Sequence, residues 1–204
     1  MKRFLILLAS FFFIHGSTFA TFVATLNLHD LTKLSDAIIK ITITDKTSTL
    51  DESESHTFVT YYTVTVLDFL KCSPSFQNRL HLNQDEFTFK QIGQGDFVKN
   101  GRQVHVDYDV PEYKVGTTYV LFLPAAHPTT GLMAPIGLDQ GSFRVLTQNG
   151  QESLPEFKAR ARRLNQNLPN TAQNQALSLQ INHVQTEPTY QNFKSMIQAV
   201  KDTP

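Results

Sequence analysis

The chain has 204 residues, of which 41% are hydrophobic and 18% are charged, with 18 basic and 18 acidic side chains. This length suits one domain of ordinary size with an appendage. The balanced charge without a basic cluster argues against a nucleic-acid partner, because phosphate binding needs a local excess of Lys and Arg. The single cysteine, Cys72, excludes an intramolecular disulfide and a four-cysteine zinc site.

Residues 1–20 have the composition of a secretory signal peptide. Two basic residues precede an apolar run over residues 4–14, and the small side chains of Thr18 and Ala20 supply a cleavage motif. We therefore predict a mature chain that begins at Thr21 and is exported to the periplasm or the extracellular space. No later apolar run approaches the roughly 20 residues that span a bilayer, so we expect no membrane span after cleavage.

Residues 21–146 have the pattern of a mostly-β domain. Leucines at every third position predict a short N-terminal helix within residues 26–37. The polar, acidic stretch 45–56 is expected to be a loop. Closely spaced strands with Gly and Pro turns favour an all-β barrel over a parallel α/β sheet. The expected strands cover residues 37–44, 57–70, 87–92, 103–110 and 117–123, with a shorter pair near 133–136 and 142–146.

Residues 147–204 are richer in Asn and Gln and poorer in apolar side chains, so we expect a polar, partly helical C-terminal segment. A Ser N-cap and a Pro in the first turn predict a helix over 154–168. Its basic side chains could dock an acidic partner, although such a stripe is more often a solvated face. Apolar residues at i, i+3, i+4 and i+7 predict a second helix over 189–200. The stretch 170–188 between them is expected to be a polar linker.

Five runs, in their order along the chain, resemble a family of secreted bacterial domains of unknown function. They are SDAIIKITIT, FVTYYTVTVLDFLK, FTFKQIGQG, EYKVGTTYVLFL and GLDQGSFRVL. The same layout is similar to the inhibitory domain of the tissue inhibitors of metalloproteinases and to netrin modules, which are Greek-key barrels of the OB type. The resemblance covers residues 27–146 and the last helix. It implies a five- to six-stranded OB-like Greek-key barrel with a short N-terminal helix and a helical C-terminal segment.

The resemblance also implies an exported, non-enzymatic protein-binding module. Members of the bacterial family are found beside secreted matrixin-type metalloproteases, so a secreted protease or another exported protein is the expected partner. The animal inhibitors chelate the protease zinc through an N-terminal cysteine that disulfides hold in place. Here the equivalent residue is Thr21, whose amine could approach a metal, so the fold is carried over and the inhibitory residues are not. The alternative is a carbohydrate- or small-ligand-binding module of the cell envelope.

One row of side chains has the chemistry of a metal site. His105, Asp107 and Asp109 alternate along VHVDYDV and therefore share one face of the predicted strand. An imidazole and two carboxylates can hold a metal, but such a row is more often a solvated strand face. We therefore expect no metal and no cofactor, and keep these three residues as the one candidate set.

Catalytic motifs give no support to an enzyme. The chain has no HExxH and no Gly-x-Ser-x-Gly elbow, and the Gly93-Gln-Gly95 run lacks the third glycine of a phosphate-binding loop. Cys72 follows Lys71, and a neighbouring cation can lower a thiol pKa, but a lone thiol at a turn is the simpler explanation. We expect no catalytic residues.

Aromatic side chains concentrate in the predicted strands. On the outer face of an OB-type barrel such rings can stack on bases or sugars. The chain has no tryptophan and no basic groove, so most of these rings are better explained as barrel core. Tyr61 and Tyr113 are the two candidates for exposed ligand-binding rings.

Overall fold

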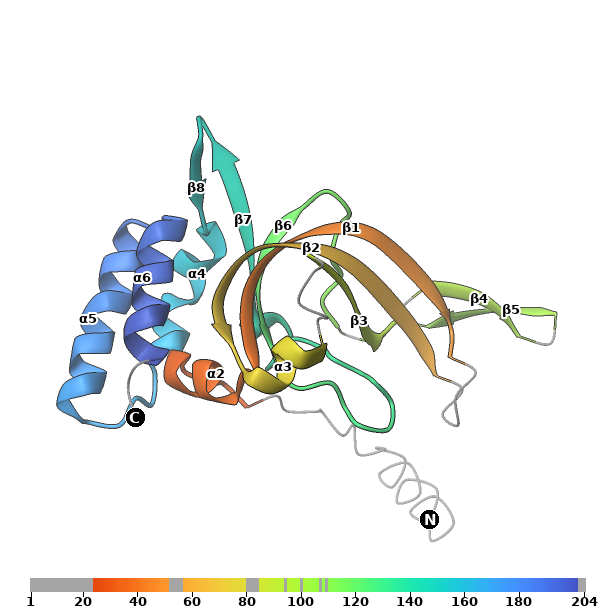
Figure 1. Ribbon diagram of the computed structural model, residues 1–204, viewed down its shortest axis with the longest axis horizontal. Coiled ribbons are helices and arrows are strands. Elements are labelled where there is room, and N and C mark those ends of the chain that lie inside the picture. The colour runs from red at the N-terminus through yellow and green to blue at the C-terminus, as the bar shows by residue number, and fades with distance from the viewer. Residues whose placement is uncertain are drawn as a thin grey trace, which may run out of the picture.

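The computed structural model describes residues 24–51, 57–79, 85–93, 95–99, 101–106, 108 and 110–201, and the account below concerns those residues (Figure 1). The candidate residues Thr21, Asp107 and Asp109 lie outside them, as does the predicted signal peptide. In chain order the elements are α2 (Leu28–Leu34), β1 (Ala37–Leu50), β2 (Phe58–Cys72), α3 (Pro74–Arg79), β3 (Glu86–Ile92), β4 (Gly95–Lys99), β5 (Arg102–Val106), β6 (Thr118–Leu123), η2 (Leu138–Gly141), β7 (Ser142–Gln148), β8 (Gln151–Ser153), α4 (Pro155–Leu164), α5 (Ala172–Thr186) and α6 (Tyr190–Lys201).

Six strands form one antiparallel sheet in the order β3-β2-β1-β6-β7-β8, and β4 pairs with β5 in a separate hairpin. The long pair β1 and β2 has register shifts after Ile38, Lys40 and Ile43. Each shift increases the local bend and twist of the strands. Together they curve β1 and β2 into the arch seen in Figure 1, from which the β4–β5 and β7–β8 hairpins project.

The sheet is not closed into a barrel, so the barrel predicted from the sequence is not confirmed. Among the described residues, no strand ladder joins β3 at one edge to β8 at the other. The segment 124–136 runs beside β3 and pairs with it through one isolated bridge, between Lys90 and Leu132. Pro128 and Pro135 lie in this segment and lack the N–H that a regular ladder needs. The short strand expected there is therefore reduced to a single bridge.

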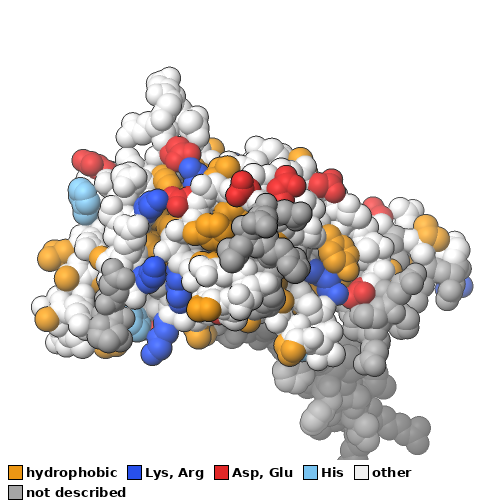
Figure 2. All heavy atoms as spheres, in the orientation of Figure 1, with side chains coloured by type: hydrophobic (Ala, Val, Ile, Leu, Met, Phe, Trp, Pro, Cys, Tyr) orange, Lys and Arg blue, Asp and Glu red, His pale blue; other side chains and the backbone are white. Residues whose placement is uncertain are grey.

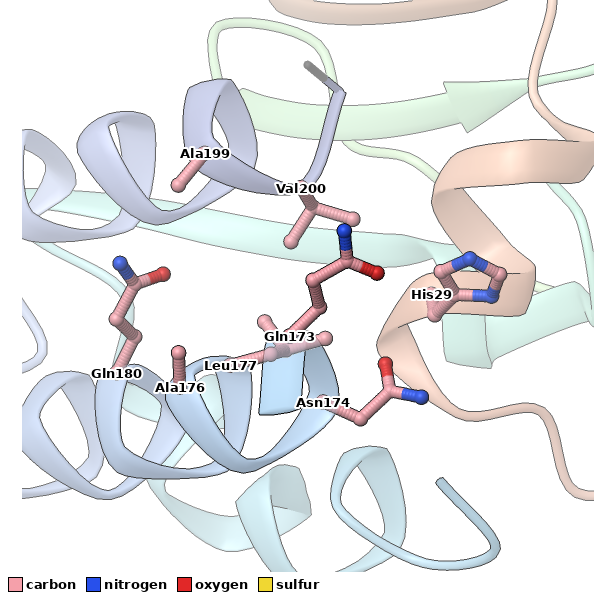
Figure 3. A pocket seen from close by; sticks show the side chains of 8 residues that line it. All are labelled: His29, Gln173, Asn174, Ala176, Leu177, Gln180, Ala199 and Val200. Atoms are coloured by element: carbon pink, nitrogen blue, oxygen red, sulfur yellow. The ribbon is translucent and has the colours of Figure 1, made fainter. Parts of the chain in front are cut away.

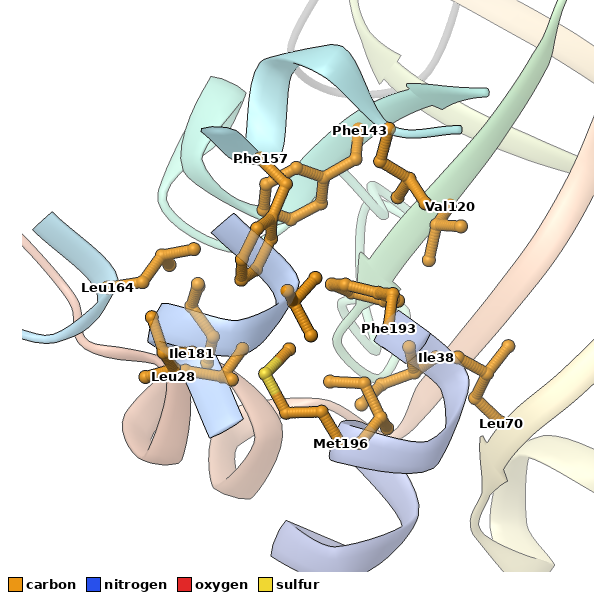
Figure 4. Close-up of a cluster of buried hydrophobic side chains, with 14 of the residues drawn as sticks. Leu28, Ile38, Leu70, Val120, Phe143, Phe157, Leu164, Ile181, Phe193 and Met196 are labelled. Atoms are coloured by element: carbon orange, nitrogen blue, oxygen red, sulfur yellow. The ribbon is translucent and has the colours of Figure 1, made fainter. Parts of the chain in front are cut away.

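Helices α2, α4, α5 and α6 cover one face of the sheet, which we call the helix-covered face (Figures 1 and 4). Phe193 of α6 is completely buried at its centre. Its ring lies 6.4 Å from that of Phe122, 5.7 Å from Phe143 and 5.4 Å from Phe157, measured between centroids. These rings come from two strands and two helices, so the aromatic cluster joins the C-terminal helices to the sheet.

The stretch 170–188, expected to be a linker, instead contains the helix α5. The hydroxyl of Thr171 caps this helix by accepting a hydrogen bond from the backbone N–H of Asn174. Leu177, Ile181 and Val184 are buried along one side, at i, i+4 and i+7. The abundant Asn and Gln residues lie mainly on the other sides of the helix. Their number gave the stretch the polar composition from which a linker was predicted. The predicted helices at 154–168 and 189–200 are confirmed as α4 and α6, although α4 ends at Leu164 and its N-cap is Leu154, not the expected Ser153.

The opposite face of the arch, which we call the inner face, carries a second core of isoleucine and aromatic side chains. The Tyr62 ring lies 5.3 Å from both Phe89 and Tyr113, and Tyr113 lies 5.1 Å from Tyr119. Edge-to-face contacts of this kind stabilise a core beyond the burial of ring area. The aromatic side chains in the strands are thus mainly core, as the composition predicted.

Lys71 and Gln140, which lie in the sequence runs that carry the family resemblance, connect segments that are distant along the chain. Lys71 donates from Nζ to the carbonyl oxygens of Thr32 and Ser35, at 2.7 Å and 2.6 Å, and so caps the C-terminal end of α2. Gln140 accepts from the N–H of Leu26 at 2.9 Å and donates to the carbonyl of Ala24 at 3.1 Å. Its amide therefore fastens the first described residues to η2.

Candidate functional site

The inner face opens into a cavity of about 420 Å³ beside β3. That volume lies in the range of pockets that bind small molecules. The lining residues come from β2, α3, β3 and the segment 124–136, and they are mostly apolar or aromatic. They are Tyr61, Phe76, Phe87, Thr88, Phe89, Lys90, Ala126, Gly131 and Met133.

Local geometry fixes two walls of this cavity. Phe76 reaches it from α3, whose first turn is capped by the Ser73 hydroxyl accepting from the Phe76 N–H at 3.1 Å. The Phe76 ring stands edge-on to Phe87, with centroids 5.8 Å apart. Opposite them, Met133 donates its N–H to the Lys90 carbonyl at 2.6 Å, which attaches the loop to β3. The cavity is therefore bounded by side chains held in defined positions.

The charged residue in the lining, Lys90, is paired with a carboxylate. Lys90 Nζ lies 2.7 Å from Asp51 Oδ2, and each side chain is only 14% exposed. The same Nζ lies 5.8 Å from the centre of the Tyr61 ring, within reach of a cation–π interaction. A ligand in the cavity would thus meet rings, methyl groups and a paired lysine, a lining that suits an uncharged apolar group.

Two further hollows lie elsewhere on the molecule. One of about 310 Å³ is bordered by the segment 111–117, β7 and α4 and has a polar lining. The other, of about 140 Å³, lies where α2, α5 and α6 meet, with His29 and Gln173 at its border and Val200 along α6 (Figure 3). The last is below the size of ordinary ligand pockets and has room for only a few water molecules.

The surface around these features carries both signs of charge. On the face shown in Figure 2, acidic side chains lie along the upper part of the view, and basic ones lie mainly below them, with hydrophobic side chains between. No helix in the described part of the chain is long and apolar enough to cross a membrane.

The structure separates the residues that the sequence singled out. Tyr61 is half-buried at the cavity. Tyr113 is only 2% exposed, so its ring face is not available for stacking on a ligand. His105 is exposed on the β4–β5 hairpin, where Nδ1 lies 2.9 Å from Asp96 Oδ1. Within the described ranges, no three His, Cys, Asp or Glu side chains come close enough together to hold a metal ion.

The titratable groups of the inner face are shifted by burial. Burial raises the pKa of the Cys72 thiol, the Asp36 carboxylate adds to the rise, and the Gln77 side chain opposes it. The net direction is opposite to the lowering that a neighbouring cation would cause. A raised pKa keeps the thiol protonated and poorly nucleophilic. Burial likewise raises the pKa of the Tyr62 phenol to about 12, which keeps it neutral in the core.

The main cavity residues were missed from the sequence because they belong to segments without periodicity. Phe76 lies in a six-residue helix, and Ala126 and Met133 lie in a Pro- and Gly-rich segment expected to contain turns. The available signal was the presence of apolar side chains in such segments. It does not reveal which strand those side chains pack against.

Comparison with known proteins gives no match to this chain among family models, curated proteins or solved structures.

Proposed function

We propose that the protein is an exported, non-enzymatic binding module that holds a small, uncharged, apolar ligand in the cavity beside β3. The cavity itself is the observation that supports this proposal. Phe76, Phe87, Phe89 and Met133 supply apolar walls, and the lining lysine, Lys90, is paired with a carboxylate. A carbohydrate would need several hydrogen-bond partners, and the lining offers few, so the apolar class is favoured over the sugar class.

Binding would follow from burial of apolar surface against these walls, at about 25 cal/mol per Å² of area removed from water. The Met133 thioether is flexible and polarisable, so it can adapt to the outline of a ligand. The Phe76 and Phe87 rings would give edge and face contacts to a planar or branched hydrocarbon group.

A neutral fluorescent probe, N-phenyl-1-naphthylamine, tests the proposal. The chain has no tryptophan, so protein emission does not interfere with the probe signal. We expect saturable enhancement of probe emission with the native protein. An Ala126→Leu variant should bind the probe at least about tenfold more weakly, because the larger side chain occupies the cavity.

Ala125→Leu is the matched control, since Ala125 is exposed and does not line the cavity. It should bind the probe as the native protein does. The proposal fails if the native protein gives no saturable signal, or if Ala126→Leu retains native affinity while its melting temperature shows that it is folded.

The OB-like barrel is also a proposal, supported by one segment that contacts two separated strands. Leu132 forms its bridge to Lys90 of β3 in the parallel sense, and Ile136 donates its N–H to the Phe122 carbonyl of β6 at 2.9 Å. A strand at this position would join the two ends of a five-stranded barrel. Slow hydrogen exchange at the Met133 and Ile136 amides would support a rudimentary barrel, and rapid exchange at both would argue for an open sheet.

A second candidate function is partner or inhibitor of a secreted metalloprotease, as the resemblance implies. The supporting observation is the pair of hydrogen bonds between the Gln140 side chain and the backbone of Ala24 and Leu26. A mature chain beginning at Thr21 would extend only a few residues beyond this fixed point. If the function holds, the mature protein should inhibit cleavage of a fluorogenic peptide by a matrixin-type metalloprotease, and Gln140→Leu should weaken inhibition. Gln148→Leu, at an exposed site, is the control; lack of inhibition at equimolar protein would remove this candidate.

A further inference from the structure

We propose that the polar hollow of about 310 Å³, bordered by the segment 111–117, β7 and α4, binds the carboxylate group of a small organic acid. This site is separate from the apolar cavity beside β3, and its test does not depend on that proposal. Three features carry the inference: a buried hydroxyl without a hydrogen bond, an immobilised guanidinium, and the local balance of charge.

The buried hydroxyl belongs to Tyr113. The residue is only 2% exposed, and its hydroxyl makes no hydrogen bond of ordinary geometry with any described residue, although the Ser142 side chain lies near enough to act on it. Burial raises the pKa of this phenol, while the neighbouring Ser142 side chain and Arg160 guanidinium oppose the rise. Buried hydroxyls almost always have a partner, because losing their contact with water is otherwise uncompensated. The hydroxyl is thus a donor in the wall of the hollow that still lacks an acceptor.

The backbone around Tyr113 is held in place by other side chains. Gln91 donates from Nε2 to the Pro111 carbonyl at 2.7 Å, and the Tyr119 hydroxyl accepts from the N–H of Lys114 at 3.3 Å. The Tyr62 hydroxyl accepts from the N–H of Tyr113 itself at 3.4 Å. These contacts fix an irregular segment, so the Tyr113 hydroxyl cannot easily turn away to find a partner.

Arg160 of α4 presents a guanidinium that is already oriented. Its Nη1 donates to the carbonyl oxygens of Asp139 and Ser142, the latter at 2.8 Å, and the group lies 5.5 Å from the centre of the Phe143 ring. The Nη2 atom lies 3.7 Å from Asp139 Oδ2 and 3.8 Å from Glu156 Oε2. Those separations are too long for hydrogen bonds, so Nη2 can donate to an incoming acceptor without releasing the contacts that position it.

The charges at the hollow favour a single negative charge on the ligand. Three basic residues (Lys114, Arg144 and Arg160) and three acidic ones (Glu112, Asp139 and Glu156) border it, and Lys46, just outside the lining, donates a hydrogen bond to Glu112. Counted with Lys46, the cations exceed the carboxylates by one. A planar monoanion matches the donor geometry of Arg and Tyr, whereas a phosphate dianion would be repelled by the bordering carboxylates. The volume lies at the lower end for ligand pockets, which selects a small acid.

Propionate is the probe that we would use, with propionamide as its neutral counterpart. Tyrosine rings labelled with ¹³C allow the Tyr113 signal to be followed by NMR during titration. We expect a saturable shift of that signal with propionate and little response to propionamide. Tyr113→Phe removes only the hydroxyl and should weaken binding by at least about tenfold, followed at the Arg160 side-chain resonance. Tyr108→Phe, at an exposed tyrosine outside the hollow, should leave the affinity unchanged.

A stability measurement on the same variant keeps the test decisive. Because the Tyr113 hydroxyl has no hydrogen bond of ordinary geometry among the described residues, Tyr113→Phe should melt at the native temperature or higher. A marked loss of stability would mean that the hydroxyl already has a protein partner, and the proposal would be wrong. It would also be wrong if propionate gives no saturable shift, or if inorganic phosphate or propionamide binds as well as propionate.

Discussion

Both faces of the arched sheet carry a core of apolar and aromatic side chains, but only one of the two cores is fully covered. On the helix-covered face, four helices seal a core in which Phe193 and its ring neighbours are completely enclosed. On the inner face, the rings of Tyr62, Phe89 and Tyr113 form an equally tight cluster, but cavities open on both sides of it. The contrast suggests a division of labour that mutation can test: the enclosed face has no room for a ligand, and the two cavities proposed as ligand sites border the inner face.

Each face also carries one lysine in the same kind of environment. Lys40 is paired with Glu152 at 2.5 Å and lies 4.3 Å from the Tyr190 ring centre on the helix-covered face. On the inner face, Lys90 has Asp51 at 2.7 Å and the Tyr61 ring at 5.8 Å. Long lysine stems cover apolar surface while their charges are neutralised at the border of each core. The repeated arrangement makes the two faces directly comparable by mutation.

The largest expected difference between the faces comes from removing one buried ring. Phe193→Ala should lower the free energy of unfolding by about 3–5 kcal/mol, because the enclosed site cannot collapse around the lost ring. Phe76→Ala removes an equally buried ring that borders an existing cavity, and it should be at least about 1 kcal/mol less destabilising. Urea unfolding of both variants measures the difference. Equal losses would show that the inner face is packed as tightly as the sealed one.

A smaller difference is expected from the two lysines. Lys90→Met removes the cation beside Asp51, whose side chain is only 14% exposed. Lys40→Met removes the cation beside Glu152, whose side chain is 32% exposed. A less hydrated carboxylate is more costly to leave without its cation, so we expect losses of about 2 kcal/mol and about 1 kcal/mol respectively. Chemical denaturation in low salt checks the order. The reverse order would mean that the Lys40 pair contributes more to stability than its exposure indicates.

The smallest expected effect is a pH dependence of stability. It comes from Asp68 of β2, which is bound by two side chains of α6. Burial alone would raise the pKa of Asp68, but hydrogen bonds from Lys194 and from the Tyr190 hydroxyl bring it below its usual value. A carboxyl with a lowered folded pKa adds stability above about pH 4, where it is ionised in the unfolded chain as well. That stability is lost as the pH falls through the lower, folded value.

Thermal melts of the native protein and of Asp68→Asn between pH 7 and pH 2 test this contribution. The native protein should lose more stability than the variant below about pH 4, so the two curves converge at low pH. Asp45→Asn, at an exposed position, is the control. Parallel curves for the native protein and Asp68→Asn would show that the Asp68 contacts add no pH-dependent stability.

The sequence by itself determined much of the secondary structure, although residues 45–50, expected to be part of a loop, belong to β1. Alternating β-branched residues gave β2, β3 and β6 within one or two residues, and the i, i+3, i+4 and i+7 spacing gave α6. It also determined that the chain is mostly β and that its aromatic side chains are largely core. These properties follow from local periodicity, because a strand or helix that buries one face must repeat its apolar residues at a fixed interval.

Tertiary structure alone decided where the sheet ends and where its cavities lie. Whether the segment 124–136 closes a barrel depends on how many backbone donors it can offer to β3, and its prolines limit that number. The cavity beside β3 needs α3 and this same segment to meet, and no local pattern encodes that contact. Tyr113 shows the same limit: its exposure depends on Gln91, Tyr62 and Tyr119, which fold the segment inward. Periodicity is a property of neighbours along the chain, whereas a site is made by residues that only folding brings together.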